Sequence, residues 1–156
     1  MDDGPDTALD TAAVERACER LVLDSAAHND SKDWAALAAL YTPDARLERP
    51  SGQVVEGREA IEAAYRAGPA DRQARHVCTN ITITVGGPAE ATGTTTVVLY
   101  AWTAPPPGET GDGELPTFPP PALGEFVDSF ALTEQGWRIS ARQARLIARP
   151  DIGQSA

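Results

Sequence analysis

The fold class is decided by the stretch from Arg75 to Thr103, RHVCTNITITVGGPAEATGTTTVVLYAWT. Residues 75–85 alternate between apolar and polar side chains, and this alternation predicts a strand. The GGP at 86–88 predicts a turn, and the β-branched and aromatic residues at 91–103 predict a second strand. Two long strands on either side of a short turn indicate an antiparallel sheet.

The sheet is expected to continue after a long loop. Residues 123–133 and 137–148 predict two more strands, joined by the EQG at 134–136. Between the two strand pairs lies 104–122, APPPGETGDGELPTFPPPA, which is too rich in proline and glycine for regular structure. Long loops of this kind are usually lids or mobile segments. We expect a stiffened loop beside a pocket, with Phe118 at the pocket mouth; a proline-rich ligand for another domain is the alternative.

Helices are expected before this sheet. Apolar residues recur at spacings of three and four along 11–28, which predicts an amphipathic helix. The NDS at 29–31 breaks it, and Ser31 is expected to cap a second helix, with Asp33 favoured by the dipole in its first turn. The predicted elements in this half are helix 11–28, a helix from Ser31 to Tyr41, strands 45–49 and 53–56, and helix 58–67.

Helices followed by a meander of strands indicate the α+β class. We expect a cone-shaped barrel, made of a strongly curved and mainly antiparallel sheet with three helices packed on its concave side. Such a shape encloses a cavity suited to a small molecule. The chain of 156 residues fits one domain at 11–149, with flexible tails at 1–10 and 150–156.

Charge and composition exclude several classes of partner. A net charge of −10 disfavours nucleic acid and anionic membrane surfaces, because both repel an acidic protein. The acidic N-terminus lacks the apolar core of a signal peptide, and no stretch approaches the roughly 20 apolar residues of a membrane span. We therefore expect a cytoplasmic protein. Cys18 and Cys78 are expected to be reduced and packed, and no metal-ligand spacing occurs.

One segment carries a family resemblance. Residues 29–34, NDSKDW, resemble the helix-loop-helix segment of the scytalone dehydratase-like branch of the SnoaL-like, or nuclear transport factor 2-like, superfamily. The resemblance covers roughly residues 10–148, and this fold hosts many different reactions. The other similar segments are LYTPDA at 40–45, VEGREAI at 55–61, RHVCTN at 75–80, FVDSF at 126–130 and GWRI at 136–139.

The resemblance implies a catalytic pair. In dehydratase-like members an aspartate at the first helix-loop boundary pairs with a strand histidine, and these positions correspond to Asp30 and His76. Removal of a proton α to a carbonyl needs a base such as histidine, which a buried carboxylate would orient. Tyr41 or Tyr100 would donate to the developing enolate oxygen. The implied function is a dehydratase-like lyase, or an isomerase or cyclase, which acts on a small cyclic carbonyl compound such as a polyketide- or steroid-like metabolite and needs no cofactor or metal.

Non-catalytic interpretations of the same residues stay open. Asp30 could be a solvent-facing cap, and His76 lies opposite Val77, Ile81 and Ile83 unless a bulge intervenes. Asn29 replaces the tyrosine of the family pattern, and no second histidine occurs on the next strand. These departures favour the alternative of a non-catalytic module that binds a small ligand or pairs with another subunit. The other histidine, His28, is better explained as a residue that favours a helix C-terminus.

Six further residues are candidates for binding a hydrophobic small molecule. Aromatic side chains are each more often core than functional, but one or two should line the cavity. Asp128 could be a second carboxylate in the pocket, although most such residues face solvent. Arg142 could bind a carboxylate or phenolate, or pair with Asp128 across the hairpin. The apolar surface of the sheet suggests a homodimer or homotrimer. The candidates are Tyr65, Tyr100, Trp102, Phe118, Asp128 and Arg142.

Overall fold

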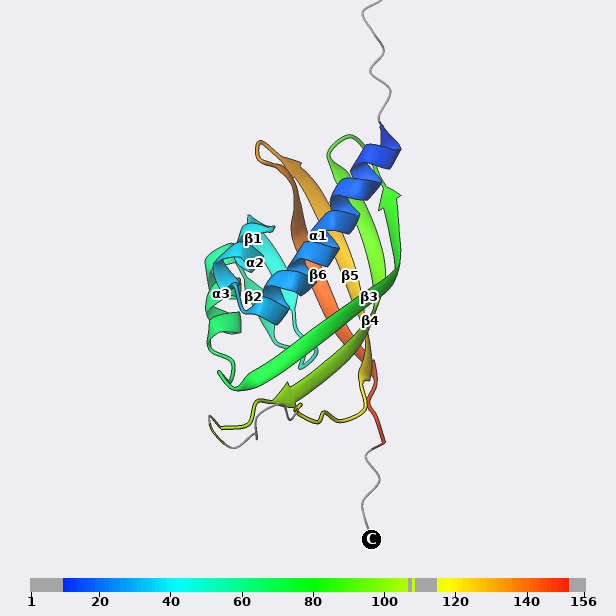
Figure 1. The fold of residues 1–156 in the computed structure, drawn as a ribbon. Helices are drawn as coiled ribbons and strands as arrows, with labels where there is room; N and C mark the ends of the chain where they lie inside the picture. The colour runs from blue at the N-terminus through cyan, green and yellow to red at the C-terminus, as the bar shows by residue number, and fades with distance from the viewer. Residues whose placement is uncertain (1–9, 107, 109–114, 152–156) are drawn as a thin grey trace, which may run out of the picture.

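The computed structural model describes residues 10–106, 108 and 115–151 (Figure 1). Most of the two predicted tails therefore lies outside the described residues. The helices are α1 (Thr11–Ser31), α2 (Trp34–Ala39) and α3 (Arg58–Arg66). The strands are β1 (Tyr41–Glu48), β2 (Val54–Glu56), β3 (Arg72–Val85), β4 (Glu90–Thr103), β5 (Ala122–Thr133) and β6 (Gly136–Ala148).

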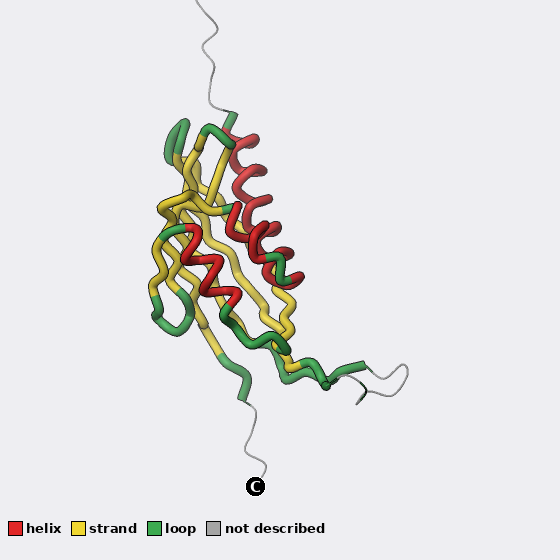
Figure 2. The backbone as a smooth tube through the Cα atoms, turned by 90° about the vertical axis from the view of Figure 1, so that its left-hand side faces the viewer, coloured by secondary structure: helices red, strands yellow, loops and turns green. Residues whose placement is uncertain are grey.

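The six strands form one sheet in the order β2-β1-β6-β5-β4-β3. Every neighbouring pair is antiparallel except β1 and β6, which run parallel. The three helices lie on one face of this sheet, as the turned view in Figure 2 shows. The prediction of an α+β protein with a mainly antiparallel sheet is confirmed.

The core lies between α1 and the sheet. The buried face of α1 carries Val14, Cys18, Leu21 and Val22 at the helical spacing expected from the sequence. Figure 1 shows α1 crossing the sheet diagonally in front of β5 and β6. The opposite wall is built mainly from side chains that alternate along the strands, so one face of the sheet is packed and the other is exposed.

The boundary between α1 and α2 differs from the prediction. Helix α1 continues to Ser31, so Asp30 belongs to its last turn. The helix ends because Lys32 adopts a left-handed conformation with φ of 60° and its N–H bonds to the carbonyls of Asn29 and His28. Asp33, not Ser31, caps α2, because its carboxylate accepts a hydrogen bond from the N–H of Ala36 at 3.1 Å.

The second helix is also shorter than predicted. It stops at Ala39, and Tyr41 is the first residue of β1. Pro43 therefore lies within a strand, where it has no N–H to donate. The pairing of β1 with β6 is irregular between Tyr41 and Arg46, which accommodates the proline. The Tyr41 carbonyl is held by the Arg58 side chain, with the Nε atom at 2.8 Å.

A bulge in β3 decides which way His76 faces. The pairing of β3 with β4 shifts between Thr79 and Thr82, and Asn80 has a positive φ of 49°. The extra residue places His76 on the packed face together with Ile81 and Ile83. Val77 lies on the outer face and is 49% exposed. The prediction that Val77 shares a face with the two isoleucines is therefore wrong, and the bulge is the reason.

Candidate functional site

A cavity of about 520 Å³ lies between the helices and the packed face of the sheet. Its size is typical of small-molecule sites. Residues of all three helices and of five strands contribute to its wall. The apolar part of the wall includes Leu37, Leu47, Val97, Leu99, Phe126 and Leu146.

Asp30 and His76 meet in this wall. The Asp30 Oδ1 atom lies 2.6 Å from His76 Nδ1, and Oδ2 accepts a hydrogen bond from the His76 backbone N–H at 2.9 Å. The two side chains are only 13% and 10% exposed. Because each carboxylate oxygen has its own partner on the same residue, the ring is fixed in position and in orientation.

The pairing determines which ring nitrogen can react. A carboxylate accepts hydrogen bonds, so the neutral imidazole beside it carries its proton on Nδ1 and has its lone pair on Nε2. Within the part of the chain that the structure describes, Nε2 has no hydrogen-bond partner. The ring lines the cavity and lies 6.4 Å from the ring of Phe126. His76 Nε2 is therefore a free base at the cavity surface.

A second group of polar side chains, more fully buried than Asp30 and His76, lies around Arg142. Its Nε and Nη2 atoms each donate to one oxygen of Asp128 at 2.7 Å, and Nη1 donates to Ser25 Oγ at 2.7 Å. The guanidinium lies 4.1 Å from the centre of the Phe126 ring. Asp128 is buried and paired, so the expectation that it faces solvent is wrong. Arg142 lines the cavity and Asp128 does not.

Arg142 stays charged although it is only 4% exposed. Burial by itself would lower its pKa, but the Asp128 carboxylate and the neighbouring Tyr41 raise the pKa above its usual range. A guanidinium has five N–H groups, and three of them are used by Asp128 and Ser25. The remaining two can serve a ligand oxygen.

Tyr41 does not lie where it was expected, whereas Tyr65 does. Tyr41 is completely buried and does not line the cavity, because it begins β1 and its side chain enters the core. Its hydroxyl interacts with that of Tyr65. Tyr65 does line the cavity, and its ring stacks on Trp34 at 5.8 Å. Burial raises the pKa of both hydroxyls, so both stay protonated at neutral pH.

The fold agrees with the comparison to known proteins. Residues 10–143 match the family described as the SnoaL-like domain. The chain belongs to the SnoaL-like domain family. No curated protein matches the sequence.

Solved structures with this SnoaL-like fold include candidate dehydratases. One is a candidate scytalone dehydratase from Novosphingobium aromaticivorans, 23% identical, with a TM-score of 0.74 over 94% of this chain and 93% of that one. Another is a candidate dehydratase of the nuclear transport factor 2-like family from Streptomyces avermitilis, 19% identical, with a TM-score of 0.75 over 89% and 100%. A candidate aromatic ring hydroxylase from Novosphingobium aromaticivorans is 18% identical, with a TM-score of 0.70 over 88% and 92%. At these identities the likeness establishes the fold alone.

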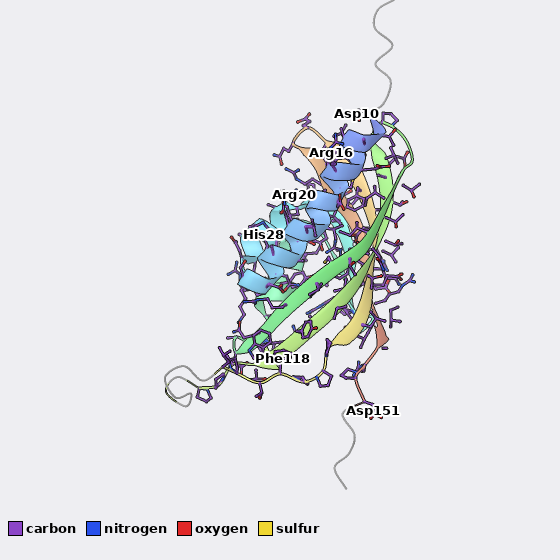
Figure 3. All side chains as sticks on the ribbon, turned by 45° about the vertical axis from the view of Figure 1, so that its right-hand side comes forward. Asp10, Arg16, Arg20, His28, Phe118 and Asp151 are labelled. Atoms are coloured by element: carbon purple, nitrogen blue, oxygen red, sulfur yellow. The ribbon has the colours of Figure 1, made fainter. Side chains whose placement is uncertain are left out.

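Besides Asp128, three predicted binding residues of this SnoaL-like domain lie outside the cavity. Leu99 lines the cavity, so Tyr100 and Trp102 project from β4 with the opposite parity, toward the outer face. Phe118 contacts both, at 5.3 Å and 6.1 Å between ring centres. Figure 3 shows Phe118 at the end of the sheet away from Asp10. The expectation that Phe118 plugs the pocket mouth is wrong, because its ring packs on these two aromatic residues instead.

Sequence reasoning missed a group of basic residues around the cavity. They come from separate elements, so no local pattern in the sequence joins them; they are Lys32, Arg49, Arg66, Arg72 and Arg145. His28 does not line the cavity. Among the described residues, no group of three or more His, Cys, Asp or Glu side chains is placed to hold a metal ion. None of the helices in the described ranges is long and apolar enough to span a bilayer.

Proposed function

We propose that this SnoaL-like domain is a cofactor-independent lyase of the dehydratase type, or an isomerase or cyclase, with His76 as its general acid–base. The substrate class is a small cyclic carbonyl compound, such as a polyketide- or steroid-like metabolite. The observation that carries the proposal is the Asp30–His76 hydrogen bond of 2.6 Å at the wall of a cavity of about 520 Å³.

The reaction begins with proton transfer to His76. A carbonyl compound lies against the apolar wall with its α-carbon near Nε2, which takes the proton while the electron pair moves toward the carbonyl oxygen. Asp30 stabilises the imidazolium that forms. A base positioned in this way contributes about 10²–10⁴-fold in rate.

The developing enolate oxygen needs hydrogen-bond donors. Tyr65 and the two free N–H groups of Arg142 both line the cavity, and both are protonated at neutral pH. One such donor is worth about 10²–10³-fold. The enolate then either expels a β-hydroxyl, which takes a proton from the imidazolium and leaves as water, or accepts that proton at another carbon. The first outcome is dehydration and the second is isomerisation.

The names of several relatives agree with this proposal, since two of them are described as candidate dehydratases. We also propose that the sheet curves into the cone-shaped barrel expected from the sequence, with Asp30 and His76 on its concave side. The second candidate function is a non-catalytic binding module. It is favoured by one observation: His76 is the only histidine that lines the cavity among the described residues.

Proton exchange tests the proposal without knowledge of the natural substrate. A base at Nε2 should catalyse deuterium exchange α to the carbonyl of cyclic ketones in D₂O, which proton NMR follows for 2-tetralone and 1-indanone. We expect His76→Ala to lower the exchange rate at least about 10²-fold and Asp30→Asn to lower it less. Arg46→Gln, which alters an exposed arginine outside the cavity wall, is the matched control.

The outcomes separate the two candidate functions. Circular dichroism is recorded first, to verify that each variant is folded before exchange is measured. A folded His76→Ala variant with the exchange rate of the parent chain would eliminate the mechanism. Absence of exchange above the buffer rate with either ketone, in the parent chain, would favour the binding module.

We propose further that the chain forms a homodimer or homotrimer through the outer face of the sheet. This face carries the exposed apolar side chains Val77, Leu123 and Ile147. Sedimentation equilibrium should give a dimer or trimer for the parent chain, and Leu123→Asp should shift it toward monomer because burying an unpaired carboxylate is unfavourable. A monomer throughout the micromolar range would contradict this proposal.

A further inference from the structure

The charge of the cavity wall is opposite to that of the whole molecule. The chain has 13 Lys and Arg residues against 23 Asp and Glu residues. Six of the 13 basic residues line the cavity, whereas the acidic residues that line it are Asp30 and Glu125. Basic side chains are therefore concentrated at one place on an otherwise acidic protein, and such a concentration attracts anions.

Both acidic residues that line the cavity have partners of their own, so neither is paired with Lys32, Arg49 or Arg72. Asp30 is bonded to His76, and Glu125 lies 3.5 Å from Arg145. Two other basic residues are likewise paired: Arg66 with Glu62, and Arg142 with Asp128.

Three basic side chains remain without a carboxylate partner among the described residues. Lys32 Nζ donates to the carbonyl of Ala70 at 2.6 Å. Arg49 donates to the neutral Gln53 side chain at 3.3 Å. Arg72 makes no side-chain hydrogen bond or ion pair within the described part of the chain.

These three residues come from different elements, and each lies next to a segment that contacts another of them or its neighbours. Lys32 ends α1 and bonds to Ala70, two residues before Arg72 at the start of β3. The Arg49 guanidinium lies 5.7 Å from the centre of the Tyr65 ring, and Tyr65 stacks on Trp34, two residues after Lys32. All three cations line the same cavity, and Arg49 lies against its aromatic residue Tyr65.

We infer that the ligand of this cavity is an anion: an apolar ring system that carries a carboxylate or another acidic oxygen group. The ring occupies the apolar wall, and the anionic group is bound by Lys32, Arg49 and Arg72. The inference rests on the proposed function for the reacting end of the ligand and adds the charge of its other end. Arg49 and Arg72 can bind a planar carboxylate through two N–H groups each, a geometry that lysine cannot offer.

A matched pair of fluorescent probes tests the inference. 1-Anilinonaphthalene-8-sulfonate is an anion, and N-phenyl-1-naphthylamine is the same aromatic frame without the sulfonate. We expect the parent chain to bind the anionic probe at least about tenfold more tightly, which corresponds to about 1.4 kcal/mol. Raising the salt concentration should weaken binding of the anionic probe and leave the neutral probe unchanged, because ions screen the attraction.

Variants locate the anion site. Arg49→Gln combined with Arg72→Gln should weaken the anionic probe about tenfold or more and leave the neutral probe within about twofold. The control combines Arg16→Gln with Arg20→Gln, which removes the same charge from the exposed side of α1, where Figure 3 shows both residues. This control should bind both probes like the parent chain.

Three results would overturn the inference: equal affinity of the parent chain for the two probes, equal weakening of both probes by the Arg49 and Arg72 substitutions, or no weakening of either. The His76→Ala variant separates this inference from the proposed reaction. It should keep its preference for the anionic probe while it loses proton exchange. A chain that prefers the anion but never catalyses exchange would support the inference and contradict the proposed function.

Discussion

At the scale of single residues, Arg142 lines the cavity and forms a buried ion pair with Asp128 in the core. The guanidinium contacts the carboxylate with two atoms, Ser25 with a third, and the ring of Phe126 with its face. Pairing keeps two charges inside the protein, so removal of either partner leaves the other charge without compensation.

The Asp128→Asn variant tests how much the stability of the folded state depends on this ion pair. An asparagine cannot neutralise the buried guanidinium, so we expect the free energy of unfolding to fall by about 3–5 kcal/mol in urea denaturation. Asp44→Asn, at an exposed position of β1, should change it by less than about 0.5 kcal/mol. A loss below about 1 kcal/mol at Asp128 would contradict the described pairing.

Cys18 makes stability sensitive to alkaline pH. Burial, and secondarily Asp128, raise the pKa of this thiol to about 11. The folded state then holds a proton that the unfolded chain loses from about pH 9, so the contribution of Cys18 is complete below pH 9 and is lost as the pH rises toward 11. It amounts to about 2 kcal/mol.

The Cys18→Ala variant isolates this contribution. Tyr41 and Tyr65 have raised pKa values as well and act in the same direction at higher pH. We therefore expect urea denaturation to show a smaller loss of stability between pH 9 and 11 for the variant than for the parent chain. Identical slopes would show that the Cys18 thiol titrates like an exposed one.

At the scale of elements, the alternating and helical patterns were sufficient to predict all three helices and all six strands. The two main differences have local causes. Helix α1 continues past the predicted break and ends where Lys32 adopts a positive φ, and the bulge at Asn80 changes the face on which the first half of β3 places its side chains. Neither can be predicted from periodicity, because lysine and asparagine adopt these conformations only where tertiary contacts hold them.

The strand β4 contains a glycine that packing requires. A Cβ atom at Gly93 would lie 2.7 Å from Ile83 Cδ1, 3.1 Å from the Thr82 carbonyl oxygen and 3.2 Å from the Phe130 ring. Gly93→Ala should therefore lower the thermal midpoint, with a loss of about 1–3 kcal/mol from overpacking. Gly87→Ala, where the nearest atom is Glu90 Cγ at 3.9 Å, is the control and should be close to neutral. Equal melting temperatures for the two variants would contradict the close packing of β3, β4 and β5.

At the scale of the whole molecule, the tertiary fold brings some of the candidate residues together around the cavity and places the others elsewhere. The structure places Asp30, His76, Tyr65 and Arg142 around one cavity, but it places Tyr41 and Asp128 in the core and Tyr100, Trp102 and Phe118 outside the cavity. The basic residues around the cavity were not predicted, because only the tertiary fold brings them together. The catalytic and binding roles themselves stay predictions.

The orientation of His76 is the claim on which the proposed chemistry depends. The most direct measurement is a long-range proton–nitrogen correlation NMR spectrum of the histidine rings, recorded where they are neutral and assigned with His28→Gln. We expect the proton of His76 on Nδ1 and a bare Nε2 in the parent chain, and loss of this preference in Asp30→Asn. A parent spectrum with the proton on Nε2, or one that Asp30→Asn leaves unchanged, would contradict the account.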